Sequence, residues 1–501
     1  MAFTRRSLLT DCCEVCSCGD LRSCRERPLR SLYCYADGRC PFGGGGLMLN
    51  YGDNLFVFPH KGKYIVYNNI DRSIVVINND ALNALKYAAI SGSDNELFPE
   101  LFTTLREFGI KLSDTRSSAD LIGLSDEDII GNFKPTAVAL FPSNNCNLRC
   151  IYCYSAASCG STVMAKDVAE AAISYAHSNA VQLGAGRTDL VFHGGGEPFF
   201  GEAWKLTKHA FDFATDSAKR RSLKLETFAS TNGVLSKAQL EWIVKNKIRI
   251  QFSFDGPESI QNANRPLANG GASYPYILRS IKFLEEAGQS YAIRATITND
   301  SVLRLPELVD FFSSISSSKR YHFEPLFECG RCATSGAEAP EPGLFVEKIW
   351  GARTYAARHG KEIFFSLGDI DHRPRFCGAL SPGFAVTPDG FVTSCYEVTR
   401  QDDPRAAVFF YGQHDLSADC QFSFDAARMR RLQARTVDNL TGCRLCVARY
   451  TCAGDCPAKF KGDIYDTMSN RDRCVIAQGH LLQHLRRAAD ELIEGEKNAA
   501  S

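Results

Sequence analysis

Strand and helix patterns alternate six times between residues 136 and 328. Each short run rich in Val, Ile, Phe and Tyr is followed by a segment with the apolar period of a helix, as in residues 165–181 and 276–287. The strands are expected at residues 136–142, 189–193, 224–230, 249–254, 291–298 and 321–327. Regular strand–helix units join parallel strands through right-handed crossovers, so this stretch predicts an α/β fold with a partial, open (β/α)6 barrel. Ligands bind such sheets at the carboxyl ends of the strands.

Three cysteines lie in the loop that follows the first expected strand. Cys146, Cys150 and Cys153 are spaced as Cys-x3-Cys-x2-Cys. Three thiolates at this spacing can bind three irons of a cubane cluster and leave the fourth iron open for a small ligand. The alternatives are a structural zinc site and unligated thiols, but zinc needs a fourth ligand and no His lies in the loop. We therefore interpret the loop as an iron-sulfur site that supports chemistry.

Glycines and polar residues stand at the ends of the later strands. After the second strand come Gly195, Gly196, Glu197 and Pro198. Glycines permit close backbone approach, and a carboxylate can receive an ammonium group. The further strand-end residues are Ser230, Thr231, Asn232, Gly233, Ser253, Asp255 and Arg265, with Arg294 on strand five. Each is an ordinary turn or strand residue alone, but their recurrence at consecutive strand ends predicts one shared site. His193 is expected to be a packed strand-end residue rather than a metal ligand.

With these motifs the chain resembles the radical S-adenosylmethionine (SAM) enzymes. The resemblance implies a 4Fe-4S cluster on Cys146, Cys150 and Cys153 whose open iron chelates the amino and carboxylate groups of SAM. Reductive cleavage of SAM would yield a 5'-deoxyadenosyl radical. The implied SAM-binding residues are Tyr152 against the adenine, Gly195, Gly196 and Glu197 at the methionine amino group, Ser253 and Arg265 near the carboxylate and ribose, and Ser230 and Asn232.

A second cysteine array follows the expected barrel. It reads Cys377-x12-Gly390-x4-Cys395, then Cys443-x2-Cys446-x5-Cys452-x3-Cys456, then Cys474. This pattern resembles the SPASM extension of radical SAM peptide-modifying enzymes, which carries two auxiliary iron-sulfur clusters; a pair of zinc knuckles is the alternative. The resemblance implies one cluster on Cys443, Cys446, Cys452 and Cys474, and the other on Cys377, Cys395 and Cys456.

The fourth ligand of the second of these clusters is left open by the sequence. Cys329 and Cys332 are the upstream candidates, and if neither reaches, an open iron could bind a substrate thiolate. Tyr396 follows Cys395 directly, whereas related sulfatase-activating enzymes carry an aspartate there as a proposed base. This departure disfavours sulfatase activation. Cys159 and Cys420 are interpreted as ordinary thiols.

Residues 49–126 predict a small α+β unit. Strands are expected at 54–58, 63–68 and 73–77, and helices at 80–89 and 97–108. The order resembles the small, winged-helix-like peptide-binding domain of ribosomal peptide maturation systems, represented by the chaperone of pyrroloquinoline quinone biosynthesis. The resemblance implies that a leader peptide adds as a strand to its exposed edge; a packing domain is the alternative. Residues 329–376 are expected to form a linker, 377–480 the SPASM domain and 481–501 a C-terminal helix. The helical pattern itself runs over about 475–496, with Leu481, Leu482, Leu485 and Ala488 on its apolar stripe.

Composition bounds the partners and the compartment. Lys+Arg and Asp+Glu both number 57, and no apolar run of about twenty residues occurs, so neither a nucleic acid nor a membrane is expected as a partner. The 21 cysteines, without a convincing secretory signal, fit metal ligation in a reducing compartment, which predicts a cytoplasmic protein. Residues 1–47 are rich in Cys and Arg. They are interpreted as a metal-binding tail, as a segment without a core, or as untranslated, with Met48 the start.

Together these features predict an enzyme that abstracts hydrogen from a precursor peptide and then forms an intramolecular thioether or carbon-carbon crosslink. A reductant such as flavodoxin or ferredoxin is the expected electron donor. One alternative is an anaerobic sulfatase maturase, which forms formylglycine. Another is an iron-sulfur electron carrier, which would leave the Gly195 to Pro198 loop without a purpose.

Overall fold

The computed structural model describes residues 49–51, 54–91, 103, 126–157, 162–381, 383–460, 463–465 and 471–499. The tail at 1–47, Cys159 and all but one residue of the helix expected at 97–108 lie outside the described residues. Within the described part of the chain, no helix has both the length and the apolar character needed to cross a membrane.

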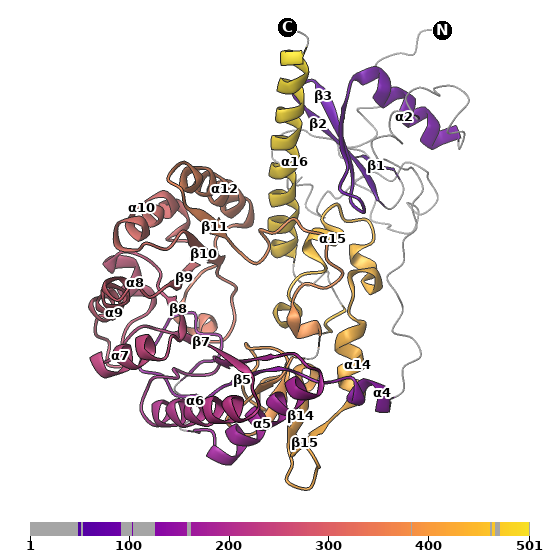
Figure 1. The fold of residues 1–501 in the computed structure, drawn as a ribbon. Helices are drawn as coiled ribbons and strands as arrows, with labels where there is room; N and C mark the ends of the chain where they lie inside the picture. Colours follow the sequence, from indigo (N-terminus) through magenta and orange to yellow (C-terminus); the bar gives the residue numbers. More distant parts are fainter. Residues whose placement is uncertain are drawn as a thin grey trace, which may run out of the picture.

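A parallel sheet forms the centre of the molecule and confirms the six expected strands. The strands are β5 (Ala137–Leu140), β6 (Arg187–Phe192), β7 (Lys224–Thr231), β8 (Arg249–Ser253), β9 (Tyr291–Ile297) and β10 (Arg320–Pro325), paired in chain order. The connecting helices line the outer side of the curved sheet (Figure 1): α5 (Lys166–Gln182), α6 (Glu202–Arg220), α7 (Lys237–Lys245), α8 (Glu258–Asn264), α9 (Tyr274–Glu286) and α10 (Leu305–Ile315). Between sheet and helices lies the main apolar core.

The sheet continues beyond six strands at one edge, inside the segment interpreted as a linker. Residues 329–376 contain α11 (Cys332–Ser335), α12 (Pro342–Arg358) and β11 (Glu362–Phe364), which pairs in parallel with β10. Glu341 caps α12 by accepting hydrogen bonds from the amides of Gly343 (2.9 Å) and Leu344 (2.5 Å), and Pro342 stands in the first turn. β11 is only three residues long, too short to show a periodic pattern in the sequence.

At the other edge the sheet takes in the region that carries the second cysteine array. β12 (Ala385–Val386) pairs in parallel with β5, and β13 (Phe391–Thr393), β14 (Phe410–His414) and β15 (Phe422–Phe424) follow in antiparallel order. Val386 pairs with Leu140, just before the Cys146 loop. This pairing therefore fixes the Cys377 to Cys395 stretch beside the first cysteine loop. Short helices complete the region: α13 (Ala406–Phe409), α14 (Ala426–Ala434), which packs on α4 (Asp126–Gly131), and α15 (Arg449–Cys452).

The N-terminal unit is an antiparallel sheet with one helix. Its strands are β1 (Leu49–Tyr51), β2 (Leu55–His60), β3 (Lys63–Asn68) and β4 (Ile74–Ile77), followed by α2 (Asn79–Ser91). Alternate side chains of β2 face opposite ways: Leu55 and Val57 share a small core with α2, whereas Phe56 and Phe58 join the main core. The long C-terminal helix α16 (Arg471–Ala499) packs on β3 and β4, as the yellow helix in Figure 1 shows.

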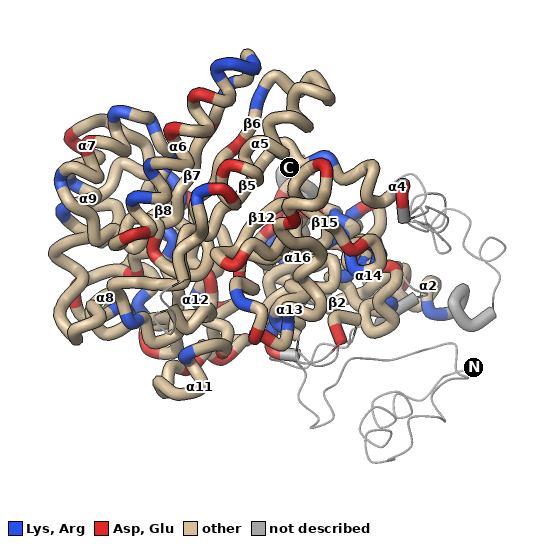
Figure 2. The backbone as a smooth tube through the Cα atoms, turned by 90° about the horizontal axis from the view of Figure 1, so that it is seen from below, with Lys and Arg blue, Asp and Glu red and all other residues tan. Residues whose placement is uncertain are grey.

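Basic and acidic residues are interspersed along the described backbone (Figure 2). This arrangement agrees with the equal numbers of the two charges in the sequence. The site must therefore be located from individual side chains rather than from a charged face.

Candidate active site

The three cysteines after β5 are free, partly buried and close enough to influence one another. Burial raises the pKa of Cys150 to about 11; Arg265 opposes this shift, and Cys153 adds to it. Burial also raises the pKa of Cys146, with Cys150 and Glu197 adding to the shift. Thiolates are therefore costly in this pocket without a metal, and an iron cluster would supply the positive charge that stabilises them. The three residues fit the three-thiolate cluster site inferred from their spacing.

Two glycines allow the loop after β6 to touch the cysteine loop. A Cβ atom on Gly196 would lie 2.1 Å from the carbonyl oxygen of Asn145, and one on Gly195 would lie 2.2 Å from Oδ1 of Asn144. The amide of Glu197 donates to the same Asn145 carbonyl at 2.9 Å. Only glycine fits at this approach, so the second loop fixes the position of the first.

Glu197 presents a buried carboxylate beside Cys146. Its side chain accepts hydrogen bonds from the hydroxyl of Thr231 (2.8 Å) and from the amides of Asn232 (2.8 Å) and Phe199 (3.2 Å). Burial raises its pKa to about 7, and these hydrogen bonds oppose that shift. A carboxylate held in this way suits a cationic ligand such as the ammonium group of SAM.

Arg265 forms a buried ion pair below the cysteine loop. Its Nε lies 3.1 Å from Oδ1 of Asp255, its Nη1 lies 4.0 Å from Sγ of Cys150, and its guanidinium lies 5.1 Å from the ring centre of Tyr152. The Tyr152 hydroxyl donates to Asp255, which also accepts hydrogen bonds from Asn264 (3.1 Å) and the amide of Thr296 (3.0 Å). Asp255, which the sequence placed at a strand end without a role, therefore orients both Arg265 and Tyr152.

The remaining predicted residues lie at the same end of the sheet. Nδ2 of Asn232 donates to Oδ1 of Asn147 at 2.8 Å and lies 3.7 Å from Sγ of Cys146, so it holds the cysteine loop. Ser230 and Ser253 are half-buried near the ends of β7 and β8.

Two residues that support the cysteine loop were missed by sequence reasoning. The hydroxyl of Ser155 lies 3.3 Å from Sγ of Cys153 and donates to the carbonyl of Gly195 at 2.6 Å. Arg331 donates to the carbonyl of Cys150 at 2.7 Å. Its neighbour Gly330 has a φ of +57°, and a Cβ atom there would lie 2.3 Å from the Cys153 carbonyl oxygen. The glycine between Cys329 and Cys332 was the available indication that this loop packs closely on another.

Four cysteines of the second array line one cavity. These are Cys443, Cys446, Cys452 and Cys474. Cys474 comes from the first turn of α16, which begins at Arg471, before the expected start of the helix. Nε2 of Gln478, one turn later, lies 3.3 Å from Sγ of Cys446. Four thiols around one cavity fit a four-thiolate iron-sulfur cluster.

Cys377, Cys395 and Cys456 are linked as a second group by their influence on one another's pKa. Burial raises the pKa of Cys395 to about 12, and Glu397 and Cys377 add to the shift. Burial also raises the pKa of Cys456, with Glu397, Cys395 and Cys377 adding to it and Lys459 opposing it. In the described parts of the chain, no three His, Cys, Asp or Glu side chains converge closely enough to hold a single metal ion.

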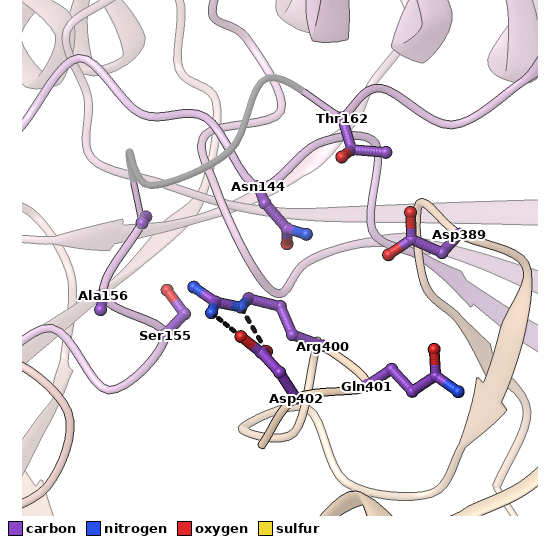
Figure 3. Close-up of a pocket in the computed structure, with 9 residues that line it drawn as sticks. Asn144, Ser155, Ala156, Thr162, Asp389, Arg400, Gln401 and Asp402 are labelled. Carbon is purple, nitrogen blue, oxygen red and sulfur yellow. Dashed lines mark hydrogen bonds and ion pairs between the residues drawn. The ribbon is translucent and has the colours of Figure 1, made fainter.

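A cleft separates the first cysteine loop from the C-terminal region. One cavity of about 540 Å³ (Figure 3) is lined by Asn144, Ser155, Ala156, Ala157, Thr162, Asp389, Arg400, Gln401 and Asp402. An adjoining cavity of about 410 Å³ shares Ser155, Ala156, Arg400 and Asp402 with it and reaches Cys329 and Lys459. Nε of Arg400 donates to Oδ1 of Asp402 at 2.8 Å where the two cavities meet.

Comparisons with known proteins agree with this site. Residues 140–311 match the radical SAM superfamily. An uncharacterized protein of Archaeoglobus fulgidus is 24% identical over 336 residues, which cover 64% of this chain and 73% of the relative. A cysteine-type anaerobic sulfatase-maturating enzyme of Clostridium perfringens is 24% identical over 211 residues, 39% of this chain, and the match spans only 52% of that enzyme.

The fold is also similar to solved structures. Structures of anSMEcpe with bound AdoMet, without and with the peptide Cp18Cys, superpose with TM-scores of 0.54 and 0.52 at 17% and 18% identity. Each covers 71% of this chain and 99% of that one.

The partial barrel with a three-cysteine loop at the carboxyl end of its first strand is the arrangement of an enzyme that uses a 4Fe-4S cluster and SAM. The chain is a radical SAM enzyme.

Proposed function

We propose that this enzyme modifies a ribosomally made peptide by hydrogen abstraction followed by an intramolecular thioether or carbon-carbon crosslink. The cleft between the first cysteine loop and the C-terminal region is the observation that supports this proposal. It runs from Ser155, beside Cys153, to Cys329 and Lys459 on the side of the second cysteine array. Two adjoining cavities of about 540 and 410 Å³ suit an extended peptide segment rather than one small molecule.

Bound SAM and its cluster supply the radical, and the chain supplies orientation. Glu197 would receive the ammonium group of SAM, and Arg265, which faces the cluster loop, would help to hold the reacting end of SAM at the mouth of the barrel. The ring of Tyr396, which is 38% exposed, packs on His193 with 4.8 Å between ring centres and on Phe141 with 5.8 Å. Tyr396 therefore offers the peptide an aromatic surface at the ends of β5 and β6, and His193 is packed, as expected.

The two C-terminal cysteine groups are proposed to hold two auxiliary iron-sulfur clusters. Each crosslink removes two hydrogens from the peptide. One leaves as an atom and the other as a proton, and one electron remains to be taken up by an acceptor. Auxiliary clusters held by these cysteines would accept that electron and return it to a flavodoxin or ferredoxin partner.

The N-terminal sheet is proposed to bind the leader of the precursor, as a winged-helix-like recognition domain. Its outer strands are β1 and β4. A cavity of about 490 Å³ adjoins Ile74 of β4 and is lined across from it by Leu481 and Leu485 of α16, with Arg72 and Arg487 at its border. An extended leader that adds to β4 would place alternate side chains in this cavity.

Formylglycine formation is the second candidate, because sulfatase-maturating enzymes are among the relatives. It is disfavoured by Tyr396, which stands where those enzymes are expected to carry an aspartate. It also assigns no role to the leader-binding cavity.

The test is co-expression with each short open reading frame beside the gene, followed by mass spectrometry of the peptide. Loss of two hydrogens per event, with a new crosslink in the fragment spectra, supports the proposal. Formylglycine, or an unchanged mass with deuterium uptake from solvent, overturns it. The Cys150→Ala variant is the control, and it should leave the peptide unmodified and form no 5'-deoxyadenosine. An electron carrier would form none even with all three cysteines present.

A further inference from the structure

A cavity of about 810 Å³, here called the basic cavity, lies between α12 and α16, outside the cysteine sites and the cleft. Its lining carries five cationic side chains and two carboxylates, an excess of three positive charges in a chain whose formal net charge is zero. The cations are Arg353, Arg358, Lys361, Arg486 and Arg487. A cavity lined mainly by one sign of charge concentrates ligands of the opposite sign.

The two carboxylates in this lining are already paired. Oε2 of Glu362 lies 2.9 Å from Nε of Arg320, a residue outside the lining. Oδ1 of Asp490 lies 2.7 Å from Nε2 of His60 and 2.6 Å from Nζ of Lys61. These acids therefore do not neutralise the cations of the basic cavity.

Four of the five cations have no carboxylate partner among the residues that the structure describes. Arg487 has one, Glu491, at 3.1 Å in an exposed pair. Nζ of Lys361 donates to two backbone carbonyls at 2.7 and 3.3 Å. Arg358 and Arg486 make no hydrogen bond or ion pair with the described part of the chain, although both line the cavity. Their donors are available to a ligand.

Arg353 is a half-buried cation whose contacts are neutral. Its Nη1 lies 2.7 Å from Nε2 of His480 and 3.4 Å from the carbonyl oxygen of Gly368. Burial lowers the pKa of Arg353, as expected for a cation without an anion beside it. Burial also lowers the pKa of His484 to about 4, and Arg353 and Arg487 add to that shift. The imidazole therefore stays neutral at a place where positive charge is already in excess.

The basic cavity adjoins the cavity proposed to receive the leader, because His484 and Arg487 line both. A peptide held in one cavity can therefore extend past these two side chains into the other. Arg353 and Arg358 are five residues apart in α12, about 7.5 Å along its axis. Alternate side chains of an extended peptide are about 6.6 Å apart, so this spacing suits several carboxylates on one segment rather than a single phosphate group.

We propose that the basic cavity binds an acidic segment of the leader peptide, whose Asp or Glu side chains pair with Arg353, Arg358 and Arg486. The inference rests on the proposed leader binding and adds the chemistry by which a leader is selected. Guanidinium groups bind carboxylates through paired, charge-assisted hydrogen bonds. An acidic segment also relieves the repulsion among cations that the fold leaves without partners, whereas a basic segment meets like charge and is rejected.

The test is the binding of fluorescein-labelled hexaglutamate to the full chain, measured by fluorescence anisotropy at low salt, with labelled hexaglutamine as the uncharged comparison. We expect hexaglutamate alone to bind, and added NaCl to weaken its binding by screening the charges. The double variant Arg358→Gln, Arg486→Gln should keep its fold, because neither side chain contacts another described group, and should bind at least about tenfold more weakly.

The matched control is Lys219→Gln with Arg220→Gln, which removes the same charge from exposed positions in the last turn of α6. This control should bind hexaglutamate as the unmodified chain does. Equal weakening in both double variants would show that binding follows net charge alone, and it would overturn the proposal. Equal binding of hexaglutamine would overturn it too, as would displacement by inorganic phosphate beyond that caused by NaCl at the same ionic strength.

The binding assay contains neither SAM nor reductant, so its result is independent of the proposed crosslinking. A chain that crosslinks its peptide but does not bind hexaglutamate would refute the basic cavity alone. Once co-expression has identified a precursor, hexaglutamate should inhibit the modification of that precursor. Unchanged modification at concentrations that saturate the cavity would refute its use by the leader.

Discussion

Replacement of Gly196 by Ala tests whether contact between the two loops sets the geometry of the SAM cluster. Gly196 does not have the positive φ that makes other residues unfavourable, so a methyl group there changes the packing alone. The new Cβ atom would lie 2.1 Å from the Asn145 carbonyl oxygen and 2.7 Å from the Asn145 nitrogen. Backbone atoms cannot rotate away as a flexible side chain can.

The size of the displacement follows from these distances. Carbon and carbonyl oxygen rarely approach closer than about 3.3 Å, so the loop that carries Cys146 must move by about 1 Å. The hydrogen bond from the Glu197 amide to Asn145, 2.9 Å long, is lost in the same movement. A misplacement of this size costs about 100-fold in rate when reacting groups must be aligned. The free energy of unfolding should fall by only about 1–3 kcal/mol, the usual cost of overpacking.

The assay measures iron per chain and the rate of 5'-deoxyadenosine formation after anaerobic reconstitution with a chemical reductant. Gly351→Ala in α12 is the matched control, because a Cβ atom there meets nothing within 4 Å. We expect Gly351→Ala to match the unmodified enzyme, and Gly196→Ala to fold but cleave SAM about 100-fold more slowly. SAM cleavage by Gly196→Ala at the rate of the control would refute the view that this contact positions the cluster.

Three further predictions concern Glu197, the ion pair of Asp255 with Arg265, and the packing of the N-terminal sheet on α16. Burial raises the pKa of Glu197 from 4.5 to about 7, so the folded protein binds this proton more tightly and its stability falls as the pH rises across that range. Because SAM needs the ionised carboxylate, SAM should raise the melting temperature more at higher pH. A similar pH dependence in Glu197→Gln would contradict this role. Asp255→Asn should lower the free energy of unfolding in denaturant titrations by about 3–5 kcal/mol, because Arg265 stays buried without its partner. The control Glu307→Gln, in an exposed ion pair, should lower it by less than about 1 kcal/mol. Equal losses would refute the importance of burial. Leu485 is 2% exposed, so Leu485→Asp should detach the N-terminal sheet from α16. Proteolysis ahead of residue 126 should become faster, and peptide modification should be lost while SAM cleavage is retained. Full peptide modification by this variant would refute leader binding there.

The sequence predicted the barrel well because each of its strands carries its own pattern. β7 and β9 have eight and seven residues, long enough for apolar periodicity to appear between turn residues. β11 and β12 have three and two residues, and their place in the sheet depends on pairing with distant strands. Of α12, β11 and β12, only α12 could have been predicted from the sequence, because Glu341 and Pro342 mark its start.

The candidate site divides in the same way. The local spacing of the cysteines predicted the cysteine site, and the glycines after β6 predicted the close approach of the loop at Gly196. The partners of these residues were not predictable, because they come from far along the chain: Arg331 contacts the carbonyl of Cys150 across 181 residues, and the Asp255 partner of Tyr152 is 103 residues away. No spacing rule links such positions, and three-dimensional packing alone brings them together.

Helix α16 joins the two ends of the proposed reaction path. It carries Cys474, which lines one cavity with three other cysteines, and sixteen residues later Asp490, which contacts His60 at 2.7 Å and Lys61 at 2.6 Å. At 1.5 Å per residue, these two points are separated by about 24 Å along the helix. An extended peptide covers about 3.3 Å per residue, so a peptide that follows α16 from Asp490 to the level of Cys474 would need at least about seven residues. Because the helix is rigid, the proposed leader binding predicts a minimum spacing between the leader and the modified residues of a substrate.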